Sequence, residues 1–302
     1  MDIGLSMIVK NEGNRLHKSL WEIYDLFDDI VVVDTWSEDN TLEILRNFHI
    51  NPILYKNPYP DQRLIEARNF SIENNKAERI LILDGDEHIS REDIIAIKKI
   101  NPSEKVDWYF VKWIDYRYKE PFEDYKMCLI RKNAVRFLFS VHACPQVYIR
   151  DNNKNGLWLN WISLSHYPEI KPHRQKYITQ LENGIKENPG CMRFYWFLWY
   201  HYFKNQLREE AKKYLIEVIN HKNTRFPVET LNSFMILASI LQNEWANLAS
   251  YQLIFEWLEF YRIVKNDFEV KINFRLYSRF KNTHNELINN HKAKIIPYEF
   301  AF

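Results

Sequence analysis

The chain has 302 residues, of which 46% are apolar, and a formal net charge of +1 at pH 7. This length and apolar content allow one large domain, or one domain with an appendage, around a sizeable core. The near-zero charge gives no electrostatic reason to expect nucleic acid or an acidic partner, and no segment is long and apolar enough to span a membrane.

Three cysteines, Cys128, Cys144 and Cys191, are widely spaced and match no zinc or redox spacing. The N-terminal residues show no signal-peptide pattern. Both features predict a reduced, cytoplasmic protein without an integral membrane segment, peripheral at the inner membrane face if it meets a membrane at all.

The first hundred residues alternate between strand and helix patterns. Strands are expected at Ile3–Val9, Asp29–Asp34, Asn51–Tyr55 and Ile80–Leu83. Helices are expected at Arg15–Leu26, Thr41–Phe48, Leu64–Asn75 and Ile94–Ile100. This alternation predicts an α/β fold with a mostly parallel sheet covered on both faces.

The acidic stretch Asp84-Gly85-Asp86-Glu87 follows the fourth of these strands directly. Three neighbouring carboxylates repel one another, and a divalent cation such as Mg²⁺ or Mn²⁺ would remove that cost. Gly85 is expected to let the backbone turn sharply. The motif therefore predicts a metal and diphosphate site, and the alternative is a polar turn with Ser90 as the cap of the next helix.

Three further side chains suit a nucleotide site, each with a structural alternative. Asp34 ends the second strand and either accepts a hydrogen bond from a base or caps its own turn. Glu12 follows the first strand and either touches the nucleotide or is a solvated turn residue. Arg68 lies on an amphipathic helix and either binds phosphate or forms a surface salt bridge.

Beyond residue 100 the pattern changes. Strands are expected at Asp107–Trp113 and Tyr125–Arg131, followed by mixed strand and loop over Val135–Tyr148. From about Pro172 the chain reads as helical to its end. The segment starting at Pro189 resembles one tetratricopeptide unit, with Trp199 at a position usually held by a small residue, and a fainter copy spans Pro227–Gln252.

Taken in order, four motifs resemble the family-2 glycosyltransferases of the GT-A fold, a mixed, Rossmann-like sheet. The motifs are SMIVKNEG (Ser6–Gly13), VVVDTWSEDNT (Val31–Thr41), EARNFS (Glu66–Ser71) and LDGDEHIS (Leu83–Ser90). The group with a tetratricopeptide-like tail, which includes lipopolysaccharide-core and bacteriocin-peptide transferases, is the most similar. The resemblance implies a GT-A domain over residues 1–170 and an α-helical, tetratricopeptide-like domain over residues 171–302.

The same resemblance implies roles for individual residues. The residues expected to bind the nucleotide sugar are Val9, Glu12, Asp34, Arg68, Asp84 and Gly85. Mn²⁺ or Mg²⁺ would be held by Asp86 and Asp84, and His166 would complete the coordination. The catalytic base is expected at Asp124, in an acidic pair with Glu123, although an acidic surface loop is an equal alternative there.

The expected activity is metal-dependent, inverting transfer of a sugar from a nucleotide sugar, with a UDP-sugar favoured. The acceptor is left open among glycans, peptides and proteins, with a modified DNA base not favoured, and the chain could form a homo-oligomer. Two rival functions remain: a nucleotidyltransferase, and a non-enzymatic helical-repeat scaffold with a relic nucleotide-binding domain.

Overall fold

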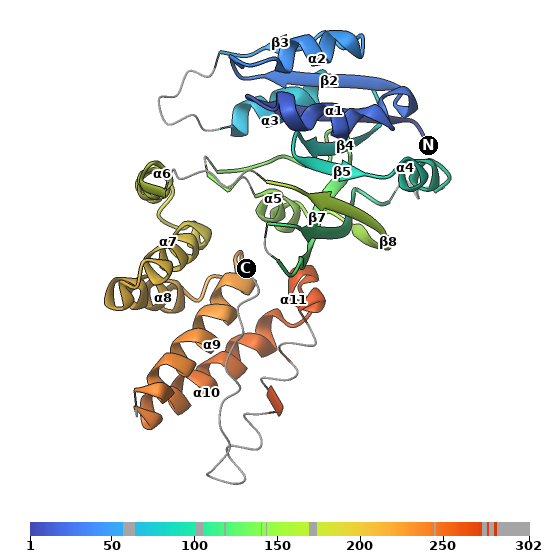
Figure 1. Ribbon diagram of the computed structural model, residues 1–302. Helices are drawn as coiled ribbons and strands as arrows, with labels where there is room; N and C mark the ends of the chain where they lie inside the picture. The colour runs from blue at the N-terminus through green and yellow to red at the C-terminus, as the bar shows by residue number, and fades with distance from the viewer. Residues whose placement is uncertain are drawn as a thin grey trace. The chain divides into compact units, whose positions relative to one another are not determined.

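The computed structural model describes residues 1–56, 64–100, 105–117, 119–139, 141–142, 144–168, 174–244, 246–273, 277 and 281–282, with the backbone alone over 174–176. The chain divides into two compact units, Met1–His173 and Arg174–Phe302 (Figure 1). The expected domain boundary between residues 170 and 171 lies outside the described residues, as do positions 283–302 of the expected second domain.

The first unit is built on one eight-stranded sheet in the order β3-β2-β1-β4-β7-β6-β8-β5. Its strands are β1 Ile3–Val9, β2 Asp29–Asp34, β3 Ile53–Leu54, β4 Arg79–Asp84, β5 Glu87–Ile89, β6 Trp108–Asp115, β7 Phe122–Arg131 and β8 Gly156–His166. The first four are parallel, β7 is antiparallel to β4 and β6, β8 is parallel to β6, and β5 is antiparallel to β8. The α/β fold with a mixed sheet is therefore confirmed, and a fully parallel order stops at β4.

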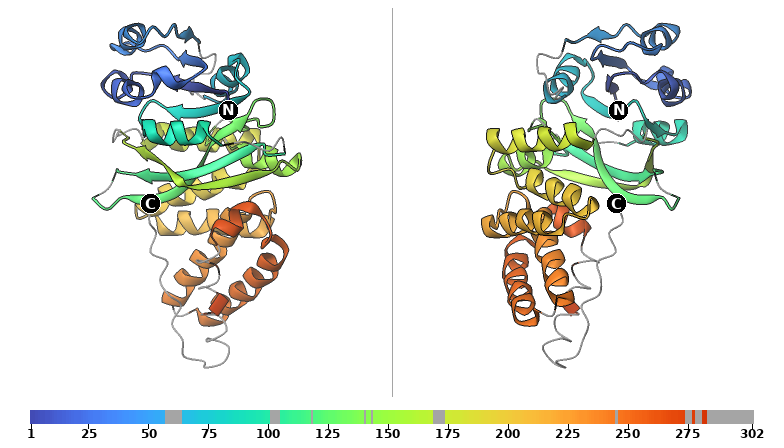
Figure 2. Two further views of the ribbon diagram at one scale, coloured as in Figure 1. Left: turned by 90° about the vertical axis from the view of Figure 1, so that its right-hand side faces the viewer. Right: turned by 60° about the vertical axis from the view of Figure 1, so that its left-hand side comes forward.

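Helices cover both faces of the parallel part. The helices of this unit are α1 Gly13–Trp21, η1 Tyr24–Leu26, α2 Thr41–Asn47, α3 Ile65–Asn74, α4 Arg91–Lys98 and α5 Pro145–Asp151. Leu16 of α1 shares a core with Leu5 and Met7 of β1. On the opposite face Ala67 of α3 packs against Val31 and Val33 of β2 (Figure 2). This division follows from the alternation of side chains along each strand.

Two local expectations were wrong. The helix expected to reach Leu26 ends at Trp21, and the short 3₁₀ turn η1 follows it. The segment expected as strand and loop contains helix α5, which begins at Pro145; proline suits the first helical position because its missing N–H has no partner there in any case.

The second unit is helical throughout its described part. Its helices are α6 Arg174–Glu187, α7 Met192–Lys204, α8 Arg208–His221, α9 Pro227–Asn243, α10 Asn247–Val264 and α11 Phe268–Ile272. Helices α7 and α8 pack as one pair and α9 and α10 as another (Figure 1). Trp199, Phe234 and Trp257 are fully buried in their common core. The tetratricopeptide-like assignment of this unit stays a prediction.

No helix in the described part of the chain is long and apolar enough to cross a membrane. The three cysteines form no disulfide with one another, and all are buried.

Candidate functional site

Two turns are fastened together at the carboxyl ends of β1 and β2. The backbone N–H of Asn11 donates to Ser37 Oγ at 2.9 Å, and that of Glu12 donates to Thr41 Oγ1 at 2.8 Å. The N–H of Gly13 donates to Asp39 Oδ2 at 3.0 Å. These three hydrogen bonds fix the position of the turn after β1, which lies next to the end of β4.

Gly85 is required by close packing. No glycine has a positive φ in the described part of the chain, so the expected sharp turn is not the reason for this glycine. A Cβ at Gly85 would instead lie 2.7 Å from Glu12 Cγ, well inside contact distance. Glu12 also pairs with Arg15 of α1, with 2.7 Å between Nε and Oε2. The acidic turn is thus held directly against the start of α1.

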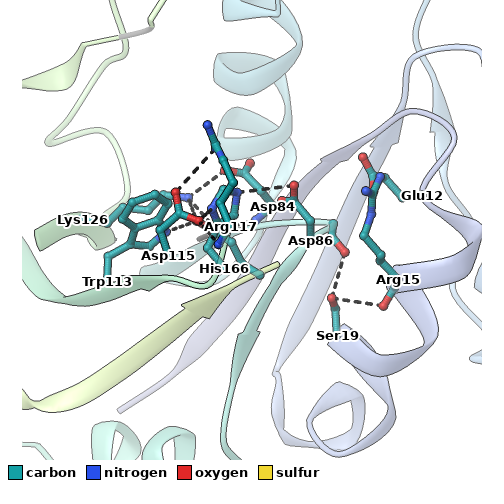
Figure 3. Close-up of polar contacts among 12 residues, drawn as sticks. Glu12, Arg15, Ser19, Asp84, Asp86, Trp113, Asp115, Arg117, Lys126 and His166 are labelled. Carbon is teal, nitrogen blue, oxygen red and sulfur yellow. Dashed lines mark hydrogen bonds and ion pairs between the residues drawn. The ribbon is translucent and has the colours of Figure 1, made fainter. Parts of the chain in front are cut away.

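A compact ion cluster occupies the end of β4 (Figure 3). Lys126 Nζ of β7 lies 2.7 Å from Asp84 Oδ2 and 2.6 Å from each carboxylate oxygen of Glu87. Arg68 Nη2 of α3 binds Asp84 Oδ1. Glu87 further accepts the N–H of Asp84 at 2.8 Å and the indole N–H of Trp113 at 2.9 Å. Two side-chain cations therefore neutralise Asp84 and Glu87, where a metal ion is expected from the acidic motif alone.

Burial and charge act in opposite directions on this cluster. Burial alone would raise the pKa of Asp84, but Arg68 and Lys126 outweigh it and hold that pKa far below its usual range. Burial would lower the pKa of Lys126, yet the carboxylates of Asp84 and Glu87 raise it above its usual value. Burial is the main cause of the raised pKa of Glu87. Lys126 and Asp84 are consequently both ionised at neutral pH.

The segment Glu66–Ser71 attaches α3 to its surroundings at several points. The side chain of Asn69 exchanges two hydrogen bonds of 3.0 Å with the backbone of Phe137. Ser71 Oγ lies 2.6 Å from Ser6 Oγ of β1. These contacts orient Arg68, whose Nη1 is buried and makes no hydrogen bond within the described residues.

Asp86 and His166 meet beside the cluster. His166 ends β8, and its Nε2 lies 3.4 Å from Asp86 Oδ2. Its Nδ1 lies 3.4 Å from Oδ1 of Asp115, the last residue of β6. Burial would raise the pKa of Asp86, but His166 and the charge of Arg15 lower it below its usual value. The structure thus brings together six of the residues that the sequence singles out: Glu12, Arg68, Asp84, Gly85, Asp86 and His166.

Asp34 and Val9 lie at the ends of neighbouring strands and have structural partners. Asp34 is fully buried, and its carboxylate accepts the N–H and the hydroxyl of Ser37 at 2.9 and 2.5 Å. It therefore caps its own turn, which is the alternative considered above. The side chain of Val9 lies in the core of the sheet. Contacts of either residue with a nucleotide stay predictions.

The acidic pair on β7 is split between two faces. Asp124 is two residues from Lys126 and lies opposite Trp113 in the strand register, so it shares the face of the ion cluster. Glu123 points to the other face, where its carboxylate pairs with Lys112 Nζ at 2.6 Å. Only Asp124 of the pair is placed on the side of the site, and both side chains belong to exposed residues.

Three residues of this site, Lys126, Asp115 and Arg15, are not among those that the sequence singles out. The sequence holds one indication for Lys126, because this charged residue directly precedes the apolar run Met127–Ile130. Asp115 carried another, because it follows an expected strand just as Asp34 and Asp84 end theirs. Neither signal identifies a partner, because Lys126 contacts Asp84 and Glu87, and Asp115 contacts His166, across long stretches of sequence.

Comparison with known proteins finds similarities to glycosyltransferases. The model of the family described as glycosyl transferase family 2 matches residues 5–99. Two curated relatives are similar over 290 residues at 25% identity: the SPbeta prophage-derived glycosyltransferase SunS of Bacillus subtilis (strain 168) and the glycosyltransferase SunS of Bacillus phage SPbeta. Each alignment covers 88% of this chain and 65% of the relative, so the chain spans just under two thirds of their length.

A solved structure shares the fold. The crystal structure of S. aureus TarS 1–349 in complex with UDP-GlcNAc superposes with a TM-score of 0.50 at 14% identity, covering 87% of this chain and 92% of that one. At this identity the likeness concerns the fold alone.

Proposed function

We propose that this chain, whose residues 5–99 carry a family-2 glycosyltransferase domain, transfers a sugar from a nucleotide sugar to an acceptor with inversion at the anomeric carbon. The donor that we favour is a UDP-sugar, and Mn²⁺ or Mg²⁺ assists. The acceptor class that we propose is a glycan, a peptide or a protein.

One observation supports this proposal above the others. A buried arginine nitrogen, Arg68 Nη1, has no hydrogen-bond partner among the described residues, although Nη2 of the same guanidinium binds the Asp84 carboxylate at the carboxyl end of β4. A buried guanidinium nitrogen left without an acceptor is costly, and a phosphate oxygen satisfies it well. Ligands of α/β sheets commonly bind at the carboxyl ends of the strands. A nucleoside diphosphate fits this position.

Asp86 and His166 fit a divalent cation whose remaining ligands come from the donor. Two ligand atoms about 2.1 Å from one ion and at right angles are about 3.0 Å apart, close to the 3.4 Å between Asp86 Oδ2 and His166 Nε2. Asp84 is already engaged by two cations. No group of three or more metal-binding side chains occurs among the described residues, so oxygens of diphosphate and water would supply the other ligands. When bound, the cation would offset negative charge on the leaving diphosphate.

The chain's own groups then have separate tasks. Arg68 donates to a phosphate oxygen and, through Asp84, stays anchored to Lys126. Asp124, on the face of the ion cluster, accepts the proton of the acceptor nucleophile. For the helical unit we propose tetratricopeptide-like pairs that contact the acceptor or a second copy of the chain.

The test is release of UDP from a panel of UDP-sugars, each with MnCl₂, MgCl₂ or EDTA. UDP-GlcNAc is the first donor to try because the solved structure with this fold holds it. We expect slow donor hydrolysis with a divalent cation, loss of that hydrolysis in Asp86→Ala, and a normal rate in Asp107→Asn. Asp107 is a buried acid that immediately precedes β6, eight residues from Asp115 at the other end of that strand.

Two outcomes would count against the proposal. Hydrolysis that survives Asp86→Ala would remove the metal assignment. Absence of any UDP-dependent rise in melting temperature, with and without Mn²⁺, would remove the nucleotide site itself.

A further inference from the structure

The imidazole of His166 lies between two carboxylates that come from different strands. Its Nε2 is 3.4 Å from Asp86 Oδ2, and its Nδ1 is 3.4 Å from Asp115 Oδ1. Nδ1 is fully buried and makes no hydrogen bond of good geometry within the described residues. An Asp115 oxygen is therefore close enough to accept from this nitrogen after a shift of a few tenths of an ångström.

The backbone fixes this arrangement. Asp115 and His166 are register partners in the parallel pair β6 and β8, and Glu87 faces His166 in the antiparallel pair β5 and β8. The N–H of Tyr116 donates to the carbonyl oxygen of His166 at 3.0 Å. Both ends of the contact are consequently set by strand pairing.

The Asp115 carboxylate is itself held in place. It accepts the backbone N–H of Arg117 at 2.9 Å, and the Arg117 guanidinium lies 3.6 Å from its other oxygen. The Trp113 ring lies 4.7 Å from the His166 ring, tilted by 33°, and restricts the imidazole plane (Figure 3). Only 7% of the Asp115 side chain is exposed, so little water competes for the contact.

We infer that Asp115 is a positioning residue that holds His166 with its proton on Nδ1. A neutral imidazole has one N–H, and the nitrogen without it carries the lone pair that binds a metal. A proton on Nδ1, facing Asp115, leaves the Nε2 lone pair facing Asp86. A histidine that binds metal through one nitrogen commonly donates the other N–H to a carboxylate, which fixes the tautomer and the ring orientation.

This inference rests on the proposed function, because the lone pair matters only if Asp86 and His166 share a cation. The rival arrangement places the proton on Nε2, donating to Asp86. Either arrangement leaves one imidazole lone pair 3.4 Å from a carboxylate oxygen. The Asp115 side chain is 7% exposed and that of Asp86 is 21% exposed, so water relieves such a contact better at Asp86, and the proton is favoured on Nδ1.

The first experiment reads the tautomer directly in the metal-free protein. Long-range ¹H–¹⁵N correlation spectra at pH 8 distinguish a protonated Nδ1 from a protonated Nε2, and the signal of His166 is identified by its loss in His166→Gln. We expect the Nδ1–H form for His166. An Nε2–H form, or an even mixture of the two, would overturn the inference without any metal in the sample.

The second experiment measures Mn²⁺ affinity by isothermal titration in the presence of UDP. We expect Asp115→Asn to weaken Mn²⁺ binding by about 10–100-fold and to leave UDP binding without metal unchanged. The matched control is Asp107→Asn. The Asp107 side chain is also 7% exposed and also accepts one backbone N–H and pairs with one arginine, Arg131, but Asp107 precedes β6, at the end of the strand away from Asp115. Its variant should bind Mn²⁺ like the wild type.

The outcomes separate this inference from the proposed function. Weakened binding in His166→Gln with unchanged binding in Asp115→Asn would overturn the role of Asp115 alone. A wild-type protein with UDP that binds no Mn²⁺ would overturn the shared metal site and, with it, this inference.

Discussion

Lys126 Nζ lies 2.6 Å from both carboxylate oxygens of Glu87, although 39 residues separate the two in the chain. Glu87 is almost fully buried, with 2% of its side chain exposed, and its charge is balanced only because β7 brings a cation to it. The expected repulsion within the acidic motif is therefore relieved by side-chain cations of the protein at Asp84 and Glu87, and a bound cation is proposed only for Asp86.

Removal of the Lys126 charge should destabilise the first unit. Lys126→Met leaves Glu87 as a buried, uncompensated carboxylate, and breaking such a pair costs about 3–5 kcal/mol. Urea unfolding followed by fluorescence measures this loss. Glu87→Gln combined with Lys126→Met should cost less than the sum of the two single changes, and strict additivity would show that the pair does not interact.

Gly85→Ala should be damaging because of packing. The added Cβ would lie 2.7 Å from Glu12 Cγ and 3.1 Å from Glu12 Cβ, and such overpacking costs about 1–3 kcal/mol. The matched control is Gly190→Ala, because a Cβ there meets no atom within 4 Å. Comparison of the two midpoints of thermal unfolding checks the prediction. Glu12→Ala removes Cγ but keeps Cβ, so it should recover part of the stability lost in Gly85→Ala; no recovery at all would rule out the Glu12 Cγ contact as the cause.

A pair of variants can distinguish the two roles considered for Asp34, which are capping its own turn and contacting a nucleotide base. Ser37→Ala removes the hydroxyl from the turn but leaves the Asp34 carboxylate in place. Asp34→Ala removes both the turn acceptor and any contact with a base. We expect UDP affinity to fall at least tenfold further in Asp34→Ala than in Ser37→Ala, as measured by titration calorimetry. Equal UDP affinities of the two variants would show that Asp34 only caps its turn and does not contact the nucleotide.

Asp107 makes stability depend on pH in the acid range. Burial would raise its pKa, but the N–H of Asn155 and the guanidinium of Arg131 lower it below its ordinary value of 3.8. A carboxyl whose pKa is lower in the folded state stabilises fully above the unfolded value and loses that stabilisation as the pH falls through the folded value. The difference in unfolding free energy between wild type and Asp107→Asn should be constant from pH 5 to 7 and shrink below about pH 3.8. A constant difference down to pH 2.5 would contradict this account.

The Cys128 thiol should be inert in the native protein. Burial raises its pKa to about 12, and the reactive species of a thiol is its thiolate. Because Cys144 and Cys191 are also buried, native protein should react with almost no Ellman's reagent within minutes at pH 8. The same protein unfolded in guanidinium should titrate three thiols. Fast reaction of Cys128 in the native state, located by mass spectrometry, would show that β7 opens readily.

Much of the first unit follows from local sequence. The apolar runs of β1, β2 and β4 and the polar turns between them were placed correctly, because a buried parallel strand reads as a continuous apolar segment. The same pattern located the acidic motif at the end of β4. The expected cap of α4 was also right, since Ser90 Oγ accepts the N–H of Asp93.

The short strand β5 could not be found in this way. Its three residues, Glu87–Ile89, carry no apolar run, and they form a strand because β8 pairs with them from nearly 80 residues later. The same pairing places His166 opposite Glu87 and next to Asp86. A local pattern holds no information about a partner so distant in the chain.

What the sequence by itself determined was the set of acids and the strand that delivers them, because strand formation and turn chemistry depend on neighbouring residues. What only the tertiary structure decided was which of these carboxylates are paired with a cation of the protein. Asp84 and Glu87 are neutralised by Arg68 and Lys126, and Asp86 alone is left facing His166. Electrostatic energy depends on distances of a few ångströms between groups, and those distances are set by how the strands are ordered in the sheet.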